Sequence, residues 1–336
     1  MAAHCFDATT FVGPCNHKAR GQHHNPPAPG RSHYLKIKRK QVCNKFFIGM
    51  KRIHTILIIL LLAVTYGEAK KSSDDRQMDD FITSLMKKMT LEEKIGQLNL
   101  GGVGSPKVVG SAIGLDEAIR KGLVSSVGGF DAKAAEDAQK FAVENSRMKI
   151  PLITGLDVVH GYYTIFPIPL ASACSWNMPL LEESARVAAD EASAFGINWT
   201  FAPMVDICRD PRWGRIAEGA GEDPCLGSRI GRAMVRGFQG DDLSKPNTLL
   251  ACVKHFALYG ASEAGRDYNT VSMDPVTMYN YYLPPYKAAF DEGAGSGMTS
   301  FNVVNGVPAT GNKWLLTDLL RDQWKFKGFM VSDANS

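Results

Sequence analysis

The chain has 336 residues, of which 45% are hydrophobic and 21% charged, a composition typical of a globular protein of one or two domains. Its net charge of +4 is unevenly distributed. Residues 1–49 contain eight Lys or Arg and one Asp, whereas residues 70–336 carry a net charge of −4. A mildly acidic body does not suit nucleic-acid binding, so we expect no nucleic-acid partner.

A secretory signal peptide is predicted at residues 50–69. It begins with Met-Lys-Arg, continues with an apolar run from Ile53 to Val64, and has small residues at Gly67 and Ala69, as a cleavage site requires. The apolar run is shorter than the roughly 18–20 residues of a transmembrane anchor. We therefore expect export to the periplasm or the extracellular space, a mature chain from Lys70, and no stable membrane insertion after cleavage.

Residues 1–49 lie upstream of this signal, which normally starts at the initiator Met. They are rich in His, Pro, Lys and Arg and show no hydrophobic period. A metal-binding arm is one interpretation, but no ligand spacing resembles a zinc site. We favour the other interpretation, which is upstream sequence translated from an early start codon or a disordered leader. The His and Cys residues concerned are His4, Cys5, Cys15, His17, His23, His24 and Cys43.

Predicted helices and strands alternate from residue 70 onward. An amphipathic helix is expected at residues 79–90, and Thr90 with Glu93 forms a capping box for a short helix at 91–94. Seven apolar runs have the character of strands, at residues 97–100, 123–127, 152–156, 198–202, 250–255, 297–301 and 329–332. Helical patterns separate them, at residues 115–121, 131–147, 179–195, 226–239, 274–292 and 312–324.

The apolar runs are continuous rather than alternating, which indicates strands buried on both faces of a parallel sheet. Polar residues follow several of these strands, namely Asp157, Lys254-His255, Asn302 and Asp333. A doubly wound sheet would gather such residues at one switch point, whereas a barrel carries them at the end of nearly every strand. We therefore predict an α/β fold at residues 70–336, a (β/α)8 TIM-type barrel that is incomplete at the C-terminus, with about seven of eight strands present.

Four cysteines remain in residues 70–336, namely Cys174, Cys208, Cys225 and Cys252. A disulfide between Cys208 and Cys225 is one possibility, because the two residues flank one loop. We favour buried free thiols, since a chain this poor in cysteine does not depend on disulfides for its stability.

Residues that can carry chemistry are concentrated in four stretches beside the predicted strands, at 155–161, 202–224, 253–269 and 297–333. Their carboxylates accept hydrogen bonds and their Arg, Lys and His side chains donate them, which suits a sugar with several hydroxyls. Cleavage of a glycosidic bond also needs a carboxylate to attack the anomeric carbon and an acid to protonate the leaving oxygen. The sequence has no phosphate-binding loop, no Gly-x-Ser-x-Gly elbow and no metal-ligand spacing.

Five motifs follow one another within these stretches and in the segment before them. They are Thr-Leu-Glu-Glu-Lys-Ile-Gly-Gln-Leu from Thr90, Leu-Asp-Val-Val-His-Gly from Leu156, Arg-Asp-Pro-Arg-Trp-Gly-Arg from Arg209, Lys-His-Phe from Lys254, and Gly-Phe-Met-Val-Ser-Asp from Gly328. In this order they closely resemble glycoside hydrolase family 3, the family of β-glucosidases and related exo-acting β-glycosidases. The resemblance covers about residues 79–336. Each motif alone is weak, but the five together in order are specific.

The resemblance implies roles for six residues by their positions. Asp333 matches the nucleophile, and Asp157 matches the carboxylate that grips sugar hydroxyls in the first subsite. Asp267 falls where the family often has a carboxylate near the nucleophile. The donors around the same sugar are Arg215, Lys254 and His255. The mechanism implied is retaining double displacement through a covalent glycosyl-enzyme, without a cofactor and without a metal.

Other residues in the same stretches are expected to serve the structure. We expect Trp213 and Phe256 to pack rather than to form a sugar platform. The acidic residues expected to organise their loop are Glu218, Glu222 and Asp223. The chain also departs from the family pattern at two places, with Phe301 where many relatives have Tyr and Ala334 where an aromatic residue often follows the nucleophile. Phe cannot supply the hydroxyl of Tyr, but neither change removes the nucleophile.

The acid/base group is not among the matched motifs. In the family's β-glucosidases a glutamate from a second, C-terminal domain usually supplies it. A single-domain branch acting on N-acetylglucosaminides instead uses a His–Asp pair on the loop after Lys-His-Phe, but residues 257–267 contain no His. The resemblance therefore implies that the acid/base is absent from this chain, and that the 336-residue fragment itself has negligible activity.

We therefore expect the parent protein to hydrolyse terminal, non-reducing β-D-glycosides, with β-glucosides as the family-level preference. Its partner would be a β-linked oligosaccharide or glycoside. A non-catalytic secreted carbohydrate-binding or scaffold protein on the same barrel is the alternative. A phosphate-dependent glycoside phosphorylase is a third interpretation, which needs an anion-binding group at the acid/base position. The sugar, the linkage and the oligomeric state stay open at this stage.

Overall fold

The computed structural model describes residues 73–102, 113–128, 132–334 and 336. One unit of the chain contains residues 89–336, and another contains residues 7–88, of which helix α2 (Ser73–Lys88) is described. Helix α2 includes most of the predicted helix at residues 79–90. The predicted leader and signal peptide at residues 1–69 lie outside the described residues. Among the described helices, none is long and apolar enough to cross a membrane.

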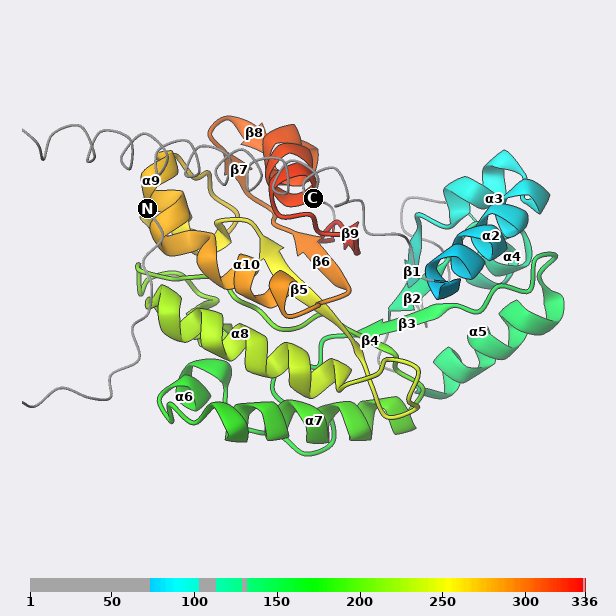
Figure 1. Ribbon diagram of the computed structural model, residues 1–336, viewed down its shortest axis with the longest axis horizontal. Coiled ribbons are helices and arrows are strands. Elements are labelled where there is room, and N and C mark those ends of the chain that lie inside the picture. The colour runs from blue at the N-terminus through cyan, green and yellow to red at the C-terminus, as the bar shows by residue number, and fades with distance from the viewer. Residues whose placement is uncertain (1–72, 103–112, 129–131, 335) are drawn as a thin grey trace, which may run out of the picture. The chain divides into compact units, whose positions relative to one another are not determined.

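Seven strands form one parallel sheet in the unit at residues 89–336 (Figure 1). The strands lie side by side in chain order, and each neighbouring pair is parallel. This is the predicted architecture, an incomplete TIM-type barrel of seven strands. The strands are β1 (Leu100–Gly102), β2 (Ser126–Gly128), β3 (Ile153–Leu156), β4 (Trp199–Thr200), β5 (Leu250–Phe256), β6 (Ser296–Thr299) and β9 (Phe329–Val331).

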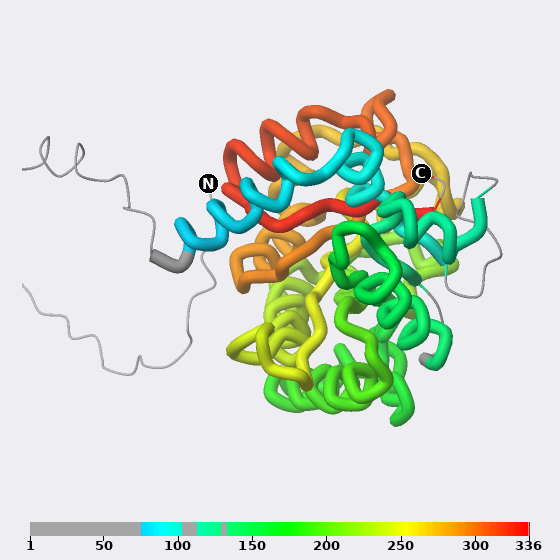
Figure 2. Tube along the Cα trace, turned by 90° about the vertical axis from the view of Figure 1, so that its right-hand side faces the viewer, coloured from blue at the N-terminus to red at the C-terminus, as the bar shows by residue number. Residues whose placement is uncertain are grey.

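Helices alternate with these strands and cover the outside of the sheet. Figure 1 shows α8 between α7 and α10, and both α8 and α10 pack on β5. In the side view of Figure 2 the orange and red C-terminal segments lie next to each other, as the pairing of β6 with β9 requires. The helices are α3 (Leu91–Gly96), α4 (Leu115–Arg120), α5 (Ala132–Asn145), α6 (Pro169–Ala173), α7 (Met178–Ala194), α8 (Pro224–Gln239), α9 (Pro275–Thr277) and α10 (Pro284–Asp291), with π-helical segments η4 (Met278–Tyr282) and η6 (Trp314–Gln323).

Strand β5 separates two hydrophobic clusters. Ala251 and Val253 belong to the large core that includes α7, α8 and α10. Cys252, between them, packs instead with Trp199 and Met298 in a cluster formed by neighbouring strands. This alternation is the period of two expected for a strand whose two faces are both buried. It accounts for the continuous apolar run that the sequence shows there.

Local sequence signals determine where several helices begin. Thr90 and Glu93 form the predicted capping box at the start of α3. Asn177, Asp223 and Asp274 cap α7, α8 and α9, and each side chain accepts a hydrogen bond from a backbone N–H of the first turn. Each of these caps is followed by Pro in the first turn, where the missing N–H costs no hydrogen bond.

The predicted boundaries differ from the structure where the chain turns. The run at residues 97–100 is predicted as a strand, but β1 begins only at Leu100. The reason is that Gln97 caps α3, and the amides of Leu98 and Asn99 donate back to the end of that helix. Short elements such as α6 and the hairpin of β7 (Val303–Val304) and β8 (Val307–Pro308) are too short to show a period in the sequence.

None of the four cysteines of the described chain is in a disulfide, so Cys208 and Cys225 are not bridged and the expected thiols are confirmed. Cys208 and Cys252 are buried as expected. Burial was wrongly predicted for the other two, since Cys225 is half-buried and Cys174 is exposed. Burial raises the pKa of the Cys252 thiol to about 12, which keeps it protonated and unreactive.

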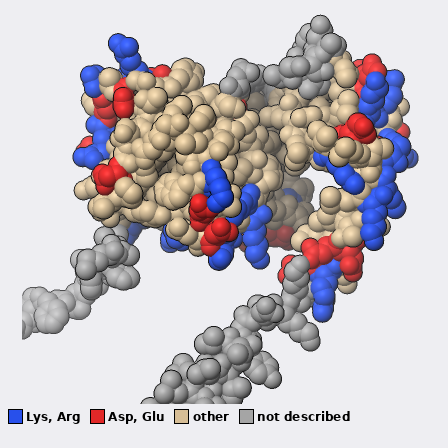
Figure 3. All heavy atoms as spheres, turned by 90° about the horizontal axis from the view of Figure 1, so that it is seen from above, with Lys and Arg blue, Asp and Glu red and all other residues tan. Residues whose placement is uncertain are grey.

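The described surface carries both signs of charge. On the face shown in Figure 3, uncharged side chains predominate, and Lys or Arg lies next to Asp or Glu in several groups. Arg236 of α8 pairs with Glu182 of α7 and with Glu292 after α10. These pairs tie the outer helices to one another at the surface, where each contributes little to stability.

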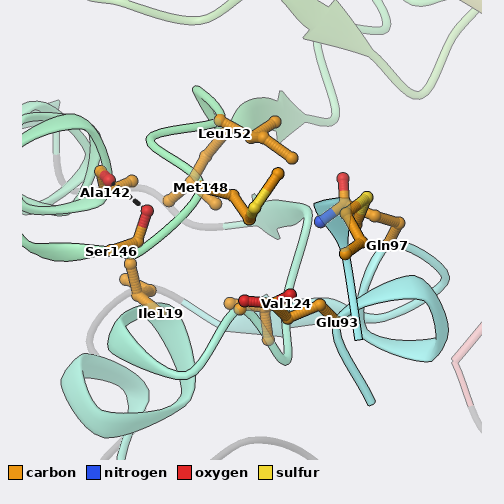
Figure 4. Close-up of a pocket in the computed structure, with 11 residues that line it drawn as sticks. Glu93, Gln97, Ile119, Val124, Ala142, Ser146, Met148 and Leu152 are labelled. Carbon is orange, nitrogen blue, oxygen red and sulfur yellow. Dashed lines mark hydrogen bonds between the residues drawn. The ribbon is translucent and has the colours of Figure 1, made fainter. Parts of the chain in front are cut away.

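A cavity of about 20 Å³ lies among α3, α4 and α5 (Figure 4). Glu93 lines it from α3, Ile119 from α4 and Ala142 from α5. Glu93 is buried, and its carboxylate is held by two groups, the backbone N–H of Thr90 and the guanidinium of Arg147. The hydrogen bond from Arg147 is the main reason that the pKa of Glu93 lies below its ordinary value.

Glu93→Gln is expected to lower the thermal midpoint by about 2–4 °C at pH 7. Gln preserves the capping box, so the variant removes the charge but not the cap. The pKa of Glu93 is depressed in the folded state, so its stabilisation is present above the ordinary carboxyl pKa and is lost as the pH falls through the lowered value. Wild type and variant should therefore converge at acidic pH in calorimetry.

The matched control is Glu117→Gln, which removes an exposed carboxylate paired with Lys121 one helical turn away. This change is expected to move the midpoint much less at pH 7. Equal destabilisation by Glu93→Gln at pH 7 and at pH 3 would contradict a charge-based role for Glu93 and would assign the effect to packing.

Candidate active site

A cleft of about 1010 Å³ runs along the parallel strands, and its lining includes residues before a strand, such as Ile150, and residues after one, such as Asp157. Asp157, predicted to bind the first sugar, lines this cleft, and so does Asp333, the predicted nucleophile. The three predicted donors line it as well, namely Arg215, Lys254 and His255. Five of the six residues identified from the sequence are therefore brought together, although nearly 180 positions of the chain separate Asp157 from Asp333.

Two neighbouring residues of strand β5, Lys254 and His255, line this cleft. Neighbouring side chains point to opposite faces of a regular strand. The pairing of β5 with β6 shifts register between Val253 and Phe256, and an irregularity of this kind re-aims side chains locally. It allows both Lys254 and His255 to reach the same side of the sheet.

Lys254 and Asp157 form an ion pair across the sheet. The Lys254 ammonium donates to Asp157 at 2.5 Å, and it comes from β5 while Asp157 follows β3. The lysine side chain is 4% exposed, whereas that of Asp157 is 52% exposed. The buried ammonium therefore has a fixed partner, and the more exposed carboxylate keeps oxygen lone pairs available to a ligand.

Arg215 and Glu218 form a second pair beside the cleft. The guanidinium donates two hydrogen bonds, of 2.7 Å and 2.8 Å, to the two carboxylate oxygens. Burial alone would raise the pKa of Glu218, but the pairing with Arg215 outweighs burial and the pKa lies below its ordinary value. Glu218 thus has the loop-organising contact expected from the sequence. Arg215 also lies over the ring of Tyr259, 5.5 Å from its centroid, so two contacts hold its orientation.

His255 faces the nucleophile candidate. Its Nε2 lies 3.5 Å from Oδ2 of Asp333, and both side chains are largely buried. The other oxygen of Asp333 accepts a hydrogen bond of 2.7 Å from the backbone N–H of Ala334. Asp333 therefore sits with one oxygen held by the main chain and the other directed toward the imidazole.

Asp267 is not among the residues that line the cleft. Its Oδ1 accepts hydrogen bonds from Trp213 Nε1 at 3.0 Å and from the hydroxyl of Tyr259 at 2.5 Å. Burial, with the hydrogen bond to Asp267 second, raises the pKa of Tyr259 and keeps its hydroxyl a donor. The structure thus places Asp267 in a layer of contacts behind the cleft, linked to Arg215 through the ring of Tyr259.

The aromatic residues named from the sequence pack as expected. Trp213 is buried against Tyr259, and Phe256 lies in the large core against Tyr286. Phe301, which replaces a Tyr of many relatives, lies 6.4 Å from the His255 ring, centroid to centroid. It forms part of an apolar wall beside the histidine and supplies no hydrogen bond there.

Sequence reasoning missed two residues of the site, Asp206 and Tyr286. Asp206 follows β4 within a stretch recognised as polar. Its Oδ2 accepts a hydrogen bond from the backbone N–H of His255 and lies 2.9 Å from the ring nitrogen Nδ1 of the same residue. Its position just after a buried strand was the available signal, the same one that identifies Asp157 and Asp333. Tyr286 lies in α10, far from any motif, and nothing in the sequence marks it.

The described residues include no group of three or more His, Cys, Asp or Glu side chains arranged to hold a metal ion. The chemistry available in the cleft is that of paired carboxylates and fixed cationic donors. Such an arrangement recognises a ligand with several hydroxyls and presents one carboxylate, Asp333, to it.

Comparison with known proteins agrees with this geometry. Residues 90–336 match the family described as glycosyl hydrolase family 3 N terminal domain. The chain is 47% identical over 260 residues to the periplasmic beta-glucosidase of Salmonella typhimurium, an alignment that covers 76% of this chain and 33% of that protein. It is 32% identical over 292 residues to a putative beta-xylosidase of Formosa agariphila, covering 81% of this chain and 39% of that protein.

Solved structures show the same similarity. The beta-glucosidase from Listeria innocua in complex with isofagomine matches with a TM-score of 0.70 and 44% identity, over 76% of this chain and 36% of that one. The same enzyme in complex with glucose matches with a TM-score of 0.69 and 43% identity, over 76% of this chain and 37% of that one. The chain spans about a third of the length of the Salmonella typhimurium and Listeria innocua beta-glucosidases. It belongs to glycosyl hydrolase family 3, and residues 90–336 form an N-terminal domain of that family.

Proposed function

We propose that the protein serves the hydrolysis of terminal, non-reducing β-D-glycosides, with β-glucosides as the preferred class. The observation that carries this proposal is the meeting of Asp333 with Asp157, Arg215, Lys254 and His255 in one cleft. The names of the relatives, beta-glucosidase and beta-xylosidase, support β-glycoside hydrolysis. The higher identity to the beta-glucosidase, 47% against 32%, supports glucose over xylose.

Asp333 is the proposed nucleophile of a retaining double displacement. In the first step a carboxylate oxygen of Asp333 forms a bond to the anomeric carbon, the bond to the leaving oxygen breaks, and a general acid protonates that oxygen. In the second step water forms a bond to the anomeric carbon and gives a proton to the same group, now acting as base. The bond to Asp333 breaks, and its carboxylate is restored.

Asp157, Lys254, Arg215 and His255 are the proposed binding groups for the reacting sugar, and Asp267 supports them from behind. Asp157 offers acceptor oxygens to sugar hydroxyls, while Lys254 and Arg215 donate to them. Because Lys254 and Arg215 are already paired with carboxylates, they hold their positions before the sugar arrives. Such preorganisation reduces the cost of ordering side chains on binding.

The general acid is a separate requirement, since it must carry a proton before the reaction begins. A carboxyl group paired with a cation is a poor candidate, because the pairing favours its ionised form. Glu218, in the described part of the site, is paired with Arg215 and its pKa lies below its ordinary value, while Asp157 is the proposed binding group for the sugar. We therefore assign the acid/base to none of these residues and expect the 336-residue chain to turn over ordinary β-glucosides negligibly.

A 2-deoxy-2-fluoro-β-glucoside with a dinitrophenolate leaving group tests the nucleophile without the acid. This leaving group departs unprotonated, and the fluorine slows hydrolysis of the glycosyl-enzyme, so the intermediate accumulates. We expect the 336-residue chain to gain the mass of one fluoroglucosyl group, which peptide mapping by mass spectrometry locates on Asp333. Asp333→Asn should abolish labelling. Asp291→Asn, which removes a surface carboxylate paired with Lys287, should label like wild type.

Other results would redirect the proposal. Glucose binding with no labelling would favour a non-catalytic carbohydrate-binding protein. Robust turnover of an aryl β-glucoside by the 336-residue chain, abolished by Asp333→Asn, would mean that the acid/base lies within it. Phosphate-dependent release of a sugar phosphate would indicate a phosphorylase.

Lys254→Ala is expected to weaken glucose binding by about 1–3 kcal/mol, or roughly fivefold to 150-fold, because a donor to the sugar is lost and Asp157 is left unpaired. Isothermal titration calorimetry with glucose measures this change. Lys287→Ala is the matched control, since it breaks an exposed Lys–Asp pair on α10. If Lys254→Ala and the control bind glucose with equal affinity, Lys254 does not contribute to sugar binding.

We also propose that the protein is exported and that its signal peptide ends at Ala69. The similarity to a periplasmic beta-glucosidase and the apolar run at residues 53–64 support this. Expression in a Gram-negative host should deliver a periplasmic product whose N-terminal sequence begins at Lys70. A charged substitution in the apolar run, Leu60→Arg, should retain the protein in the cytoplasm with its leader intact. Recovery of the uncleaved chain in the periplasm would contradict the predicted cleavage site.

A further inference from the structure

A buried carboxylate lies directly behind His255. Asp206 is almost completely inaccessible, and its Oδ2 lies 2.9 Å from the backbone N of His255 and 2.9 Å from the ring nitrogen Nδ1. A backbone N–H can only donate, so Oδ2 is an acceptor. The same oxygen therefore faces both the main chain and the ring of one residue.

Tyr286 completes the environment of this carboxylate. Its hydroxyl oxygen lies 2.5 Å from Oδ1 of Asp206 and 2.7 Å from the carbonyl oxygen of His255. Burial, with the charge of Asp206 second, raises the pKa of Tyr286 well above its ordinary value, so the hydroxyl keeps its proton and donates. Both oxygens of Asp206 are thus occupied by donors, as the burial of a carboxylate requires.

The other ring nitrogen of His255 is in the opposite situation. Nε2 is buried and has no hydrogen-bond partner among the described residues. It faces the cleft and lies 3.5 Å from Oδ2 of Asp333. A buried ring nitrogen that is left unpaired at the edge of a cleft is costly unless a ligand pairs with it.

We propose that Asp206 is a positioning residue that acts through His255, by holding the proton on Nδ1 and so presenting Nε2 to the sugar and to Asp333. The proposal rests on the proposed function, because it assigns the ligand of Nε2 to a sugar hydroxyl. The hydrogen bond that one imidazole nitrogen makes decides the role of the other. With Nδ1 committed to Asp206, Nε2 is the nitrogen that changes its proton or its partner in the cleft.

A purely structural role would not need this geometry. The hydroxyl of Tyr286 already satisfies Oδ1 of Asp206, and the backbone N–H of His255 alone would satisfy Oδ2. The contact between Oδ2 and Nδ1 is not needed to hold the main chain in place. It holds the imidazole ring in one orientation and one tautomer. Asp206 therefore determines that an unprotonated Nε2 of His255 faces the cleft.

The test measures the tautomer directly. In the full 336-residue chain labelled with ¹⁵N-histidine, His255 is identified by the signal that His255→Gln removes, and its ring ¹⁵N shifts report which nitrogen carries a proton. We expect Nδ1 to be protonated in the wild type. A wild-type ring with a bare Nδ1 and a protonated Nε2 overturns the proposal, and this result needs no variant to fold.

Variants separate positioning from packing. Asp206→Ala removes the acceptor and should shift His255 toward the form protonated at Nε2. Asp206→Asn can still turn its amide oxygen to His255, and should restore the proton on Nδ1. Tyr286→Phe is the matched control, since it removes a buried hydroxyl from the same network and should leave the tautomer unchanged. Loss of the Nδ1 proton in Tyr286→Phe, or its persistence in folded Asp206→Ala, would contradict the assignment.

Binding of glucose supplies the second readout. Asp206→Ala should weaken binding by about tenfold or more, whereas Asp206→Asn should stay within about threefold of wild type. In a His255→Gln background, Asp206→Ala should have no further effect, because the two residues act as one unit. Additive losses would mean that Asp206 does not act through His255. If the wild-type chain binds no glucose, the proposed function fails, while the tautomer still decides the role of Asp206.

Discussion

The parallel direction of all seven strands is the constraint on which the site depends. Because every strand runs the same way, the residues that follow the strands meet at one edge of the sheet. Asp157 follows β3, and Asp333 follows β9. Neither residue is close to the other in sequence, and no local interaction joins them. The sheet alone brings the proposed sugar-binding carboxylate and the proposed nucleophile into one cleft.

Charge compensation explains how this cleft tolerates so many ionised groups. Lys254 is paired with Asp157, and Arg215 with Glu218. An unpaired charge at such buried positions would be strongly destabilising, whereas a paired one is held in place. The exception is Nε2 of His255, which has no partner in the described chain and faces the cleft with Asp333. Lys254 and Arg215 are thus held by their carboxylate partners, whereas Nε2 of His255 is left for the ligand that we propose.

Behind the cleft lie two buried layers of contacts with different tasks. Asp267, Trp213 and Tyr259 support Arg215 through the face of the tyrosine ring. Asp206 and Tyr286 support His255 through its ring and main chain. Both layers rely on a tyrosine whose pKa is raised, mainly by burial, so that it remains a donor to a carboxylate. The residues that contact Arg215 and His255 from behind therefore come from α10 and from loops beside the sheet, including the loop after β5.

The amino-acid sequence by itself determined the class of fold, the order of strands and helices, and five of the residues that meet in the cleft. Continuous apolar runs and helix caps such as Thr90 are local signals that can be recognised in the sequence. A polar residue after a predicted strand becomes a site candidate because the ends of parallel strands meet at one edge of the sheet. The tertiary structure alone decided that Lys254 and His255 both line the cleft, that Asp267 does not, and that Asp206 and Tyr286 contact the histidine. These facts depend on a register shift and on contacts between elements distant in sequence, and periodicity carries no information about either.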